Sequence, residues 1–519
     1  MAVAVAAPNS ACTEAAVRVA AAGGSAVDAA IAAMVVAMSS EPGIVTPLGG
    51  GFVTVWPVDA EPETIDGNVE MPGRGLPVER LGTGLREIDV AYGGGLHMQA
   101  GHGSVATPGA FAAFGLAHER HGRVPWADVL APAVSVCRDG YPLGRSAASY
   151  LAITGTTLFA WDPQTAALLL DGDGQPWKAG ATLHDPALGD ALAQVAARGW
   201  ADLYTGELAA VIVADMQARE GLVTEADLAA YQAIVRPALR FGLGAWDFAT
   251  NPPPSIGGPL LTVMLGELAA REGRSWAEVI EIQRRVLSYR RQVHDYSEDL
   301  EEDGYTLLDA VASEGLGALP LPTSPSTAHV SVVDADGMAC AITCSSGYGS
   351  GATVPGTGLM LNNCLGEPEL NRRGVHALPS GTRLASNMAP TVGRATDGRA
   401  LAIGSPGADR ITTALMQVLA RHCLMGMPLA QAIERPRLHV KVEPVGPPHD
   451  DGSPREVTCR VEHEQDDDMA RAAAESGLSV VVHPPLSMYF GGVGAAQRDT
   501  RGGLSAAADP RRESATAVG

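Results

Sequence analysis

The stretch that decides the fold is residues 327–346, TAHVSVVDADGMACAITCSS. Two runs of alternating residues flank Asp336-Gly337, and an Asp-Gly pair between such runs is the strongest short-range sign of a β-hairpin. A loop rich in proline, serine and threonine, residues 318–326, leads into the first run, and a glycine-rich segment follows the second. The pattern therefore predicts a hairpin whose first strand begins at Thr327.

The register of this hairpin decides which side chains meet at its open end. If Ala335 faces Met338 across the turn, Thr327 faces Ser346 and Ser345 lies diagonal to it. A slip of one residue exchanges the roles of the two serines but keeps a hydroxyl beside Thr327. Two adjacent hydroxyls suit a nucleophile and the group that orients it. The alternative is a surface hairpin in which these residues only suit strand and turn.

Composition narrows the class of protein. The 519 residues carry a net charge of −22, which argues against nucleic acid or an anionic membrane as partner. The chain has only two lysines, Lys178 and Lys441, and neither stands in a Walker A loop. Seven cysteines without a C-x-x-C pair fit a reducing compartment. With no basic leader and no apolar run longer than residues 29–38, we expect a cytoplasmic protein with a small-molecule substrate.

Elsewhere helices and strands mix without a repeat or a linker, which predicts an α+β fold. A strand at Ala400–Ile403 leads through GSPGADR into a helix that starts near Ile411. Gly407-Ala408 then lie at a helix N-terminus, where free amides favour an oxyanion, although an ordinary strand-to-helix turn is the alternative. We expect the last ten residues to be disordered.

Eight motifs in order give the chain a resemblance to the γ-glutamyltransferase (γ-glutamyltranspeptidase) family of N-terminal-nucleophile hydrolases. They are GGGFV, GSVATPGA, GLVTEADLAAY, NPPPSIGG, STAHVSVVDADG, LMLNN, RLASNMAPT and IGSPGADRI. The resemblance implies a four-layer αββα sandwich and self-cleavage between Ser326 and Thr327. The products would be residues 1–326 and 327–519, which stay together as one structural domain and a heterodimer that can pair further.

The resemblance also implies roles for single residues. Thr327 is the nucleophile, and its freed α-amine is the general base, because an α-amine has a pKa of about 7.7–8.0. Ser345 matches the family's second threonine, which positions the nucleophile. Gly407 and Ala408 match a Gly-Gly pair whose amides bind the oxyanion. We expect no metal and no cofactor.

The substrate pocket departs from the family pattern. Arg74 or Arg80 is the candidate for binding a glutamyl α-carboxylate, and Glu367 is the acid nearest to the expected site for the α-amine. Gly347 replaces an Asn or Glu side chain, and Ser386-Asn387 replaces a Ser-Ser pair. The catalytic apparatus matches the family, whereas the glutamyl pocket is altered.

Three hypotheses follow. The first is an enzyme that cleaves γ-glutamyl amide bonds of glutathione-like compounds through an acyl-threonine, by hydrolysis or transfer. The second is a relative with the same nucleophile and another substrate, such as C–C bond hydrolysis of a small acid in antibiotic or other secondary metabolism. The third is an uncleaved binding protein. An α/β-hydrolase is excluded because the chain has no G-x-S-x-G motif.

Overall fold

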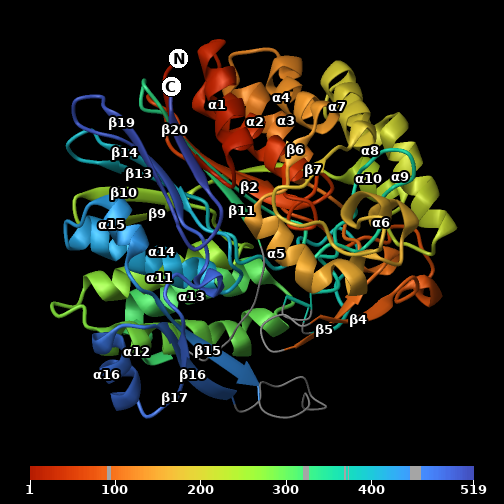
Figure 1. The fold of residues 1–519 in the computed structure, drawn as a ribbon. Helices are drawn as coiled ribbons and strands as arrows, with labels where there is room; N and C mark the ends of the chain where they lie inside the picture. Colours follow the sequence, from red (N-terminus) through yellow and green to blue (C-terminus); the bar gives the residue numbers. More distant parts are fainter. Residues whose placement is uncertain (91–94, 319–326, 368–369, 372, 445–456) are drawn as a thin grey trace.

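The computed structural model describes residues 1–90, 95–318, 327–367, 370–371, 373–444 and 457–519. Within them, two antiparallel sheets form the centre of the molecule (Figure 1). The first sheet has the strand order β20 (Ala515–Val518), β1 (Val3–Ala7), β11 (Ala328–Asp334), β12 (Ala339–Ser345), β2 (Gly50–Trp56), β3 (Glu63–Gly67) and β8 (Ile234–Pro237). The second has the order β19 (Leu504–Ala508), β18 (Gly494–Arg498), β14 (Ala400–Gly404), β13 (Thr391–Ala395), β10 (Trp246–Thr250) and β9 (Leu239–Leu243).

Helices cover the outer face of each sheet. On the first sheet the main ones are α1 (Ser10–Ala21), α2 (Ala26–Ser40), α3 (Ala110–His121) and α4 (Trp126–Asp139). On the second they are α11 (Gly257–Ala269), α12 (Trp276–Gln292) and α14 (Arg410–Leu419). The helices α5 (Arg145–Thr154) to α10 (Glu225–Ala230) lie on the same side of the molecule as the helices that cover the first sheet (Figure 1). The order is therefore helix, sheet, sheet, helix, as predicted.

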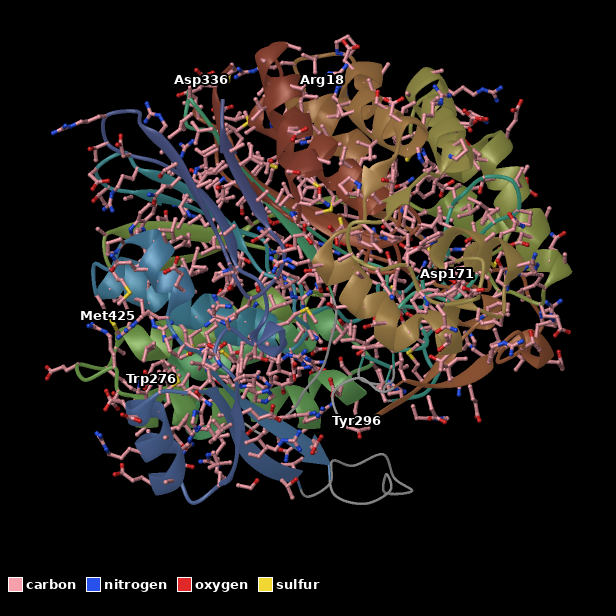
Figure 2. All side chains as sticks on the ribbon, viewed as in Figure 1. Arg18, Asp171, Trp276, Tyr296, Asp336 and Met425 are labelled. Carbon is pink, nitrogen blue, oxygen red and sulfur yellow. The ribbon has the colours of Figure 1, made fainter. Side chains whose placement is uncertain are left out.

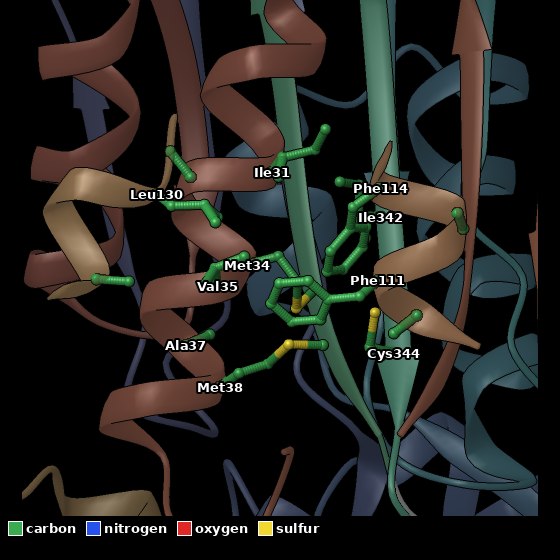
Figure 3. Packing of buried hydrophobic residues seen from close by; sticks show 14 of the residues in the cluster. Ile31, Met34, Val35, Ala37, Met38, Phe111, Phe114, Leu130, Ile342 and Cys344 are labelled. Carbon is green, nitrogen blue, oxygen red and sulfur yellow. The ribbon is translucent and has the colours of Figure 1, made fainter. Parts of the chain in front are cut away.

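Alternation along the central strands explains why both faces of the hairpin are buried. Val330, Val332 and Ile342 point to the helices and pack with the Ala-rich helix α2 and with α3 (Figure 3). On the opposite face Val333 and Ala341 pack against small residues of the second sheet. Because strands of period two bury alternate residues on each side, one hairpin joins two cores.

The hairpin is present, but its register differs by one residue from the prediction. Asp334 pairs with Met338, and the pairing continues to Ala328 opposite Cys344. One more step places Ser345, not Ser346, directly opposite Thr327. The physical reason lies at the turn, where the buried Asp334 carboxylate accepts hydrogen bonds from three backbone amides: Ala26 (3.2 Å), Gly337 (3.0 Å) and Met338 (3.0 Å).

These bonds make Asp334 the last paired residue and leave a three-residue loop. Gly337 closes that loop with φ +100°, a conformation that favours glycine. Ser346, which the two-residue turn would place opposite Thr327, instead accepts a hydrogen bond from the Thr46 amide at 2.9 Å.

The C-terminus is ordered, which corrects the expectation of disorder. Strand β20 pairs with β1, and Gly519 and Val3 exchange hydrogen bonds of 3.1 and 2.7 Å. The strand supplies partners for an edge of β1 that would otherwise expose its backbone groups. None of the described helices is long and apolar enough to cross a membrane.

Candidate active site

Thr327 directly precedes β11 and lies between two cavities. It is 3% exposed, and Ser345 at the end of β12 lines the first cavity with it. This acyl cavity, as we call it, has a volume of about 360 Å³ counting its open mouth. Its other described walls are Asn68, Val69, Cys364, Glu367, Leu370, Leu384, Ala385, Ser386, Asn387 and Met388. Thr327 and Ser345, the residues predicted to lie side by side, thus line the same cavity.

The second cavity lies on another side of Thr327 and has a volume of about 500 Å³. Its walls include Glu41, Arg512 and Glu513. Glu41 is 2% exposed, and its Oε1 accepts a hydrogen bond from Asn9 Nδ2 at 2.7 Å. Burial raises the pKa of Glu41 to about 8, so this carboxyl is largely protonated at neutral pH. We call this the Glu41 cavity.

A buried histidine supports the strand just beyond Thr327. Ser331 donates to Gly494 O at 3.1 Å, so its hydroxyl accepts from His329 Nε2 at 2.7 Å. His329 Nδ1 then accepts from the Thr343 hydroxyl at 2.8 Å. Burial lowers the pKa of His329 to about 3, which keeps the ring neutral. This network joins β11, β12 and β18 close to Thr327 in the chain.

The predicted oxyanion loop has an unusual backbone. Gly407 has φ +124° and Ala408 has φ +73°, a left-handed conformation that a non-glycine residue adopts rarely. Within the described residues, no group accepts a hydrogen bond from either amide. Pro406, the preceding residue, lines the Glu41 cavity together with Thr327. Gly407 and Ala408 themselves do not line either of the two cavities at Thr327. Their role in binding an oxyanion stays a prediction.

The predicted substrate residues divide into two groups. Glu367, Ser386 and Asn387 line the acyl cavity with Thr327. Arg74 and Arg80 do not line it.

Each of the two arginines has another environment. The Arg74 guanidinium instead lies 3.5 Å from Asp227 and 3.6 Å from Glu70. Arg80 ends a short 3-10 helix, Val78–Arg80. Among the described residues of the acyl cavity there is no arginine or lysine.

Gly347 has a steric role. It has φ +62°, and a Cβ at this position would lie 2.2 Å from Asn363 Oδ1 and 3.1 Å from Glu367 Oε1. Its amide donates to Ser345 Oγ at 3.2 Å. Glycine is therefore required here, and Asn363 and Glu367 occupy the space that a longer side chain would need.

Several site residues had no signal in the sequence. Asn68 enters the acyl cavity from a segment outside the eight motifs, Cys364 directly follows LMLNN without an assigned role, and Arg290 on α12 donates to Asn387 Oδ1. Arg512 and Glu513 were not predicted as site residues, because they belong to the last ten residues, which we expected to be disordered. Ser326, the residue before the expected cleavage, lies outside the described residues. In the described part of the chain no group of three or more His, Cys, Asp or Glu side chains could hold a metal ion.

Comparison with known proteins identifies the family. The γ-glutamyltranspeptidase family model matches residues 12–519. A glutathione hydrolase proenzyme of Pseudomonas aeruginosa is 28% identical over 85% of this chain and 83% of its own. An acylase proenzyme (ACY 1) of Pseudomonas sp. strain SE83 is 28% identical over 80% and 78%. A cephalosporin acylase structure from Bacillus halodurans superposes with a TM-score of 0.79 at 22% identity, covering 99% of this chain and 95% of that one, and confirms the fold. The chain belongs to the γ-glutamyltranspeptidase family.

Proposed function

We propose that this protein is a self-processing amide hydrolase and acyltransferase with Thr327 as its nucleophile. The observation that carries the proposal is the placement of Thr327 opposite Ser345, at the junction of two cavities. In the precursor the Thr327 hydroxyl attacks the Ser326 carbonyl carbon, and the amide nitrogen leaves as the α-amine of Thr327. Water then hydrolyses the ester and completes the cut.

The two fragments remain together because each sheet contains strands of both fragments that pair with one another. In the first sheet β11 and β12, from residues 327–519, lie between β1 and β2, from residues 1–326. In the second sheet β10 pairs with β13 across the same division. Separation would break backbone hydrogen bonds in both sheets, so we expect a tight heterodimer of the two fragments.

In the mature site the freed α-amine accepts the proton of the Thr327 hydroxyl as the hydroxyl attacks a substrate amide. The amides of Gly407 and Ala408 stabilise the developing oxyanion. The amine product leaves with a proton, and water or a second amine attacks the acyl-threonine. We assign the acyl group to the cavity that contains Ser345 and the leaving group to the Glu41 cavity.

The acyl group has two candidates. The relatives named glutathione hydrolase support a γ-glutamyl group, and Glu367 in the acyl cavity supports recognition of its α-amine. The absence of arginine and lysine among the described residues of that cavity favours a second candidate, an acyl group that has an amine but lacks the α-carboxylate.

Three matched p-nitroanilides separate these candidates. γ-Glutamyl anilide has both charges, 4-aminobutyryl anilide lacks the carboxylate, and glutaryl anilide lacks the amine. If recognition is through Glu367 alone, the first two have similar kcat/KM and glutaryl anilide is about 100-fold poorer. A γ-glutamyl pocket instead makes 4-aminobutyryl anilide much poorer than γ-glutamyl anilide.

Variants test the same assignment. Glu367→Gln should erase the preference for an amine by raising KM, whereas Thr327→Ala should abolish turnover of all three anilides. If none of the anilides reacts with protein that has been cleaved before Thr327, the proposed acyl groups are wrong. A single uncleaved 53.4 kDa band after long incubation would instead support the binding-protein hypothesis.

A further inference from the structure

A third cavity lies in the helical layer outside the second sheet. It has a volume of about 760 Å³ counting its mouth and shares no residue with either cavity at Thr327. Its walls come from α11, the start of α12, the turn 420–427 after α14, and the start of α16 (Asp467–Glu475). Trp276 and Met425, which both line it, are labelled in Figure 2.

One part of the cavity is apolar and adaptable. Trp276, Met425, Met427 and Met469 all contribute to its walls. Met425 is 49% exposed, which is unusual for so large an apolar side chain. Methionine side chains adjust to ligands of irregular shape, and the indole offers a flat surface. These walls favour a ligand with an apolar body.

The other part of the cavity is positively charged. Arg274, Arg421 and Arg435 line it. Arg421 is 6% exposed, and its guanidinium donates to two backbone carbonyls, Pro436 O at 2.7 Å and Ala432 O at 3.4 Å. In the described part of the chain no carboxylate lies within ion-pair distance of Arg421, which is uncommon for a buried arginine.

The nearby acids do not neutralise this charge fully. Asp466 accepts hydrogen bonds from the amides of Asp468 and Met469 as the N-cap of α16, and Asp468 pairs with Arg471 at 3.2 Å. Burial, followed by repulsion from neighbouring arginines, lowers the pKa of Arg421 to about 9, although Asp466 opposes the shift. Arg421 is therefore cationic at neutral pH but in an unfavourable environment, and an anion in the cavity would relieve it.

Arg274 gives a second, independent indication of an anion site. Its backbone is left-handed, with φ +46°, and its buried Nε has no hydrogen-bond partner among the described residues. A guanidinium with an unused donor at the wall of a cavity can bind an anionic group.

We propose that this cavity binds an organic anion with a single negative charge and an apolar, ring-sized body, such as an aromatic carboxylate or sulfonate. The anionic group would lie among Arg274, Arg421 and Arg435, with the apolar body against Trp276 and the methionines. A multiply charged phosphate fits less well, since more than half of the lining is apolar in character and the chain as a whole carries −22. The Arg421 guanidinium lies 5.3 Å from the Trp276 ring, so charge and apolar surface adjoin.

Two fluorescent probes that differ in one group test the proposal. 8-Anilinonaphthalene-1-sulfonate is the anion, and N-phenyl-1-naphthylamine has the same rings without the sulfonate. Each is titrated into the purified wild-type protein and into Arg274→Met/Arg435→Met. We expect the wild-type protein to bind the sulfonate saturably at this site. The double variant should bind it at least about tenfold more weakly, with less than a twofold change for the neutral probe.

Matched controls make the result specific. Arg471→Met removes an arginine close to the cavity but outside its walls and should leave both affinities unchanged. Thr327→Ala should also leave them unchanged, because Thr327 does not line this cavity. Near-ultraviolet circular dichroism checks that each variant is folded.

Three results would overturn the proposal. They are absence of saturable sulfonate binding to the wild-type protein, equal sulfonate affinity in the wild-type and double-variant proteins, or a parallel loss of both probes in the double variant. Because the assay measures binding, it does not depend on whether the proposed acylase activity is correct. Arg421→Met serves as a second variant, with the same expected loss for the sulfonate alone.

Discussion

The two ends of the central hairpin use buried polar groups in opposite ways. At the turn, the Asp334 carboxylate accepts three backbone hydrogen bonds and lines neither cavity at Thr327. At the open end, Thr327 and Ser345 lie beside cavities, and the buried Glu41 carboxyl lines one of them. Hydrogen bonds to the backbone hold one end in register, while the other end borders space that a substrate can fill. We therefore expect changes at the turn to affect stability, and changes at the open end to affect chemistry.

The largest expected effect is at Thr327. Thr327→Ala should lower amide hydrolysis by on the order of 10⁴-fold or more, because the nucleophile and its α-amine are both lost. The melting temperature should not fall, since only a hydroxyl and a methyl beside a cavity are removed and the two fragments stay covalently joined. Initial rates with the anilides and a thermal melt measure both quantities. Thr327→Ser, which keeps a hydroxyl, should still be processed, and a stable Thr327→Ala protein with wild-type rates would contradict the assignment.

At the turn we expect a large loss of stability and little change in activity. Asp334→Ala removes the acceptor of three buried amides, those of Ala26, Gly337 and Met338, and should cost about 3 kcal/mol of folding stability. The kcat of the folded protein should change less than threefold. Chemical denaturation and activity measured on the same preparation compare the two effects.

The neighbouring turn residue is the control for this experiment. Asp336 is half-exposed, and its one ion pair among the described residues is with the half-exposed Arg123, at 3.1 Å. Asp336→Ala should therefore cost less than about 1 kcal/mol. Equal losses from the two substitutions would show that the buried carboxylate does not hold the register.

Glu41 gives a pH-dependent effect at the open end. Burial raises the pKa of Glu41 to about 8, whereas the carboxyl of an unfolded chain titrates near 4.3. The folded state thus binds the proton more tightly, and the contribution of Glu41 to stability is fully present below about pH 4 and is lost as the pH rises toward 8. Glutamine keeps an acceptor for Asn9 and has no proton to lose. Glu41→Gln should therefore have little effect at pH 4.5 and stabilise the protein by a few kcal/mol at pH 8. A difference in melting temperature that stays constant with pH would contradict this account.

The smallest expected effect is in the oxyanion loop. Ala408→Gly relieves a left-handed alanine but makes the unfolded chain more flexible, so stability should change by no more than about 1 kcal/mol. The amide is kept, and kcat should stay within threefold. Gly407→Ala is the contrasting variant, because its Cβ would lie 2.7 Å from Gly491 Cα. That change should displace the loop and lower kcat at least tenfold. Similar kinetics in the two variants would exclude a role for this loop in catalysis.

The main parts of the fold could be predicted from the sequence, as could the shared position of Thr327 and Ser345 at the open end of the hairpin. The Asp-Gly turn and the alternating runs predict the hairpin, and the ordered motifs predict the four layers that the family comparison confirms. The exact register could not be predicted, because it depends on Asp334 accepting a hydrogen bond from Ala26, about 300 residues away. Only the folded chain brings these groups together.

The acyl cavity was harder to predict for a related reason. Residues such as Asn68 and Leu384 come from separate loops, and their side chains carry no spacing that identifies a ligand site. The order of the C-terminus was also missed, since the pairing of β20 depends on the free edge of β1 rather than on its own composition. The sequence therefore indicates how a bond is broken more clearly than it indicates which substrate is bound.

Mass spectrometry of the intact purified protein tests the central claim most directly. If Thr327 is the self-generated nucleophile, denatured wild-type protein should give two fragments, the second beginning Thr-Ala-His-Val. The Thr327→Ala protein should give one chain of 53.4 kDa. After a short incubation with the preferred anilide, the second fragment should gain the mass of one acyl group. An uncleaved wild-type chain that hydrolyses the anilide, or a cut at another position, would contradict the account.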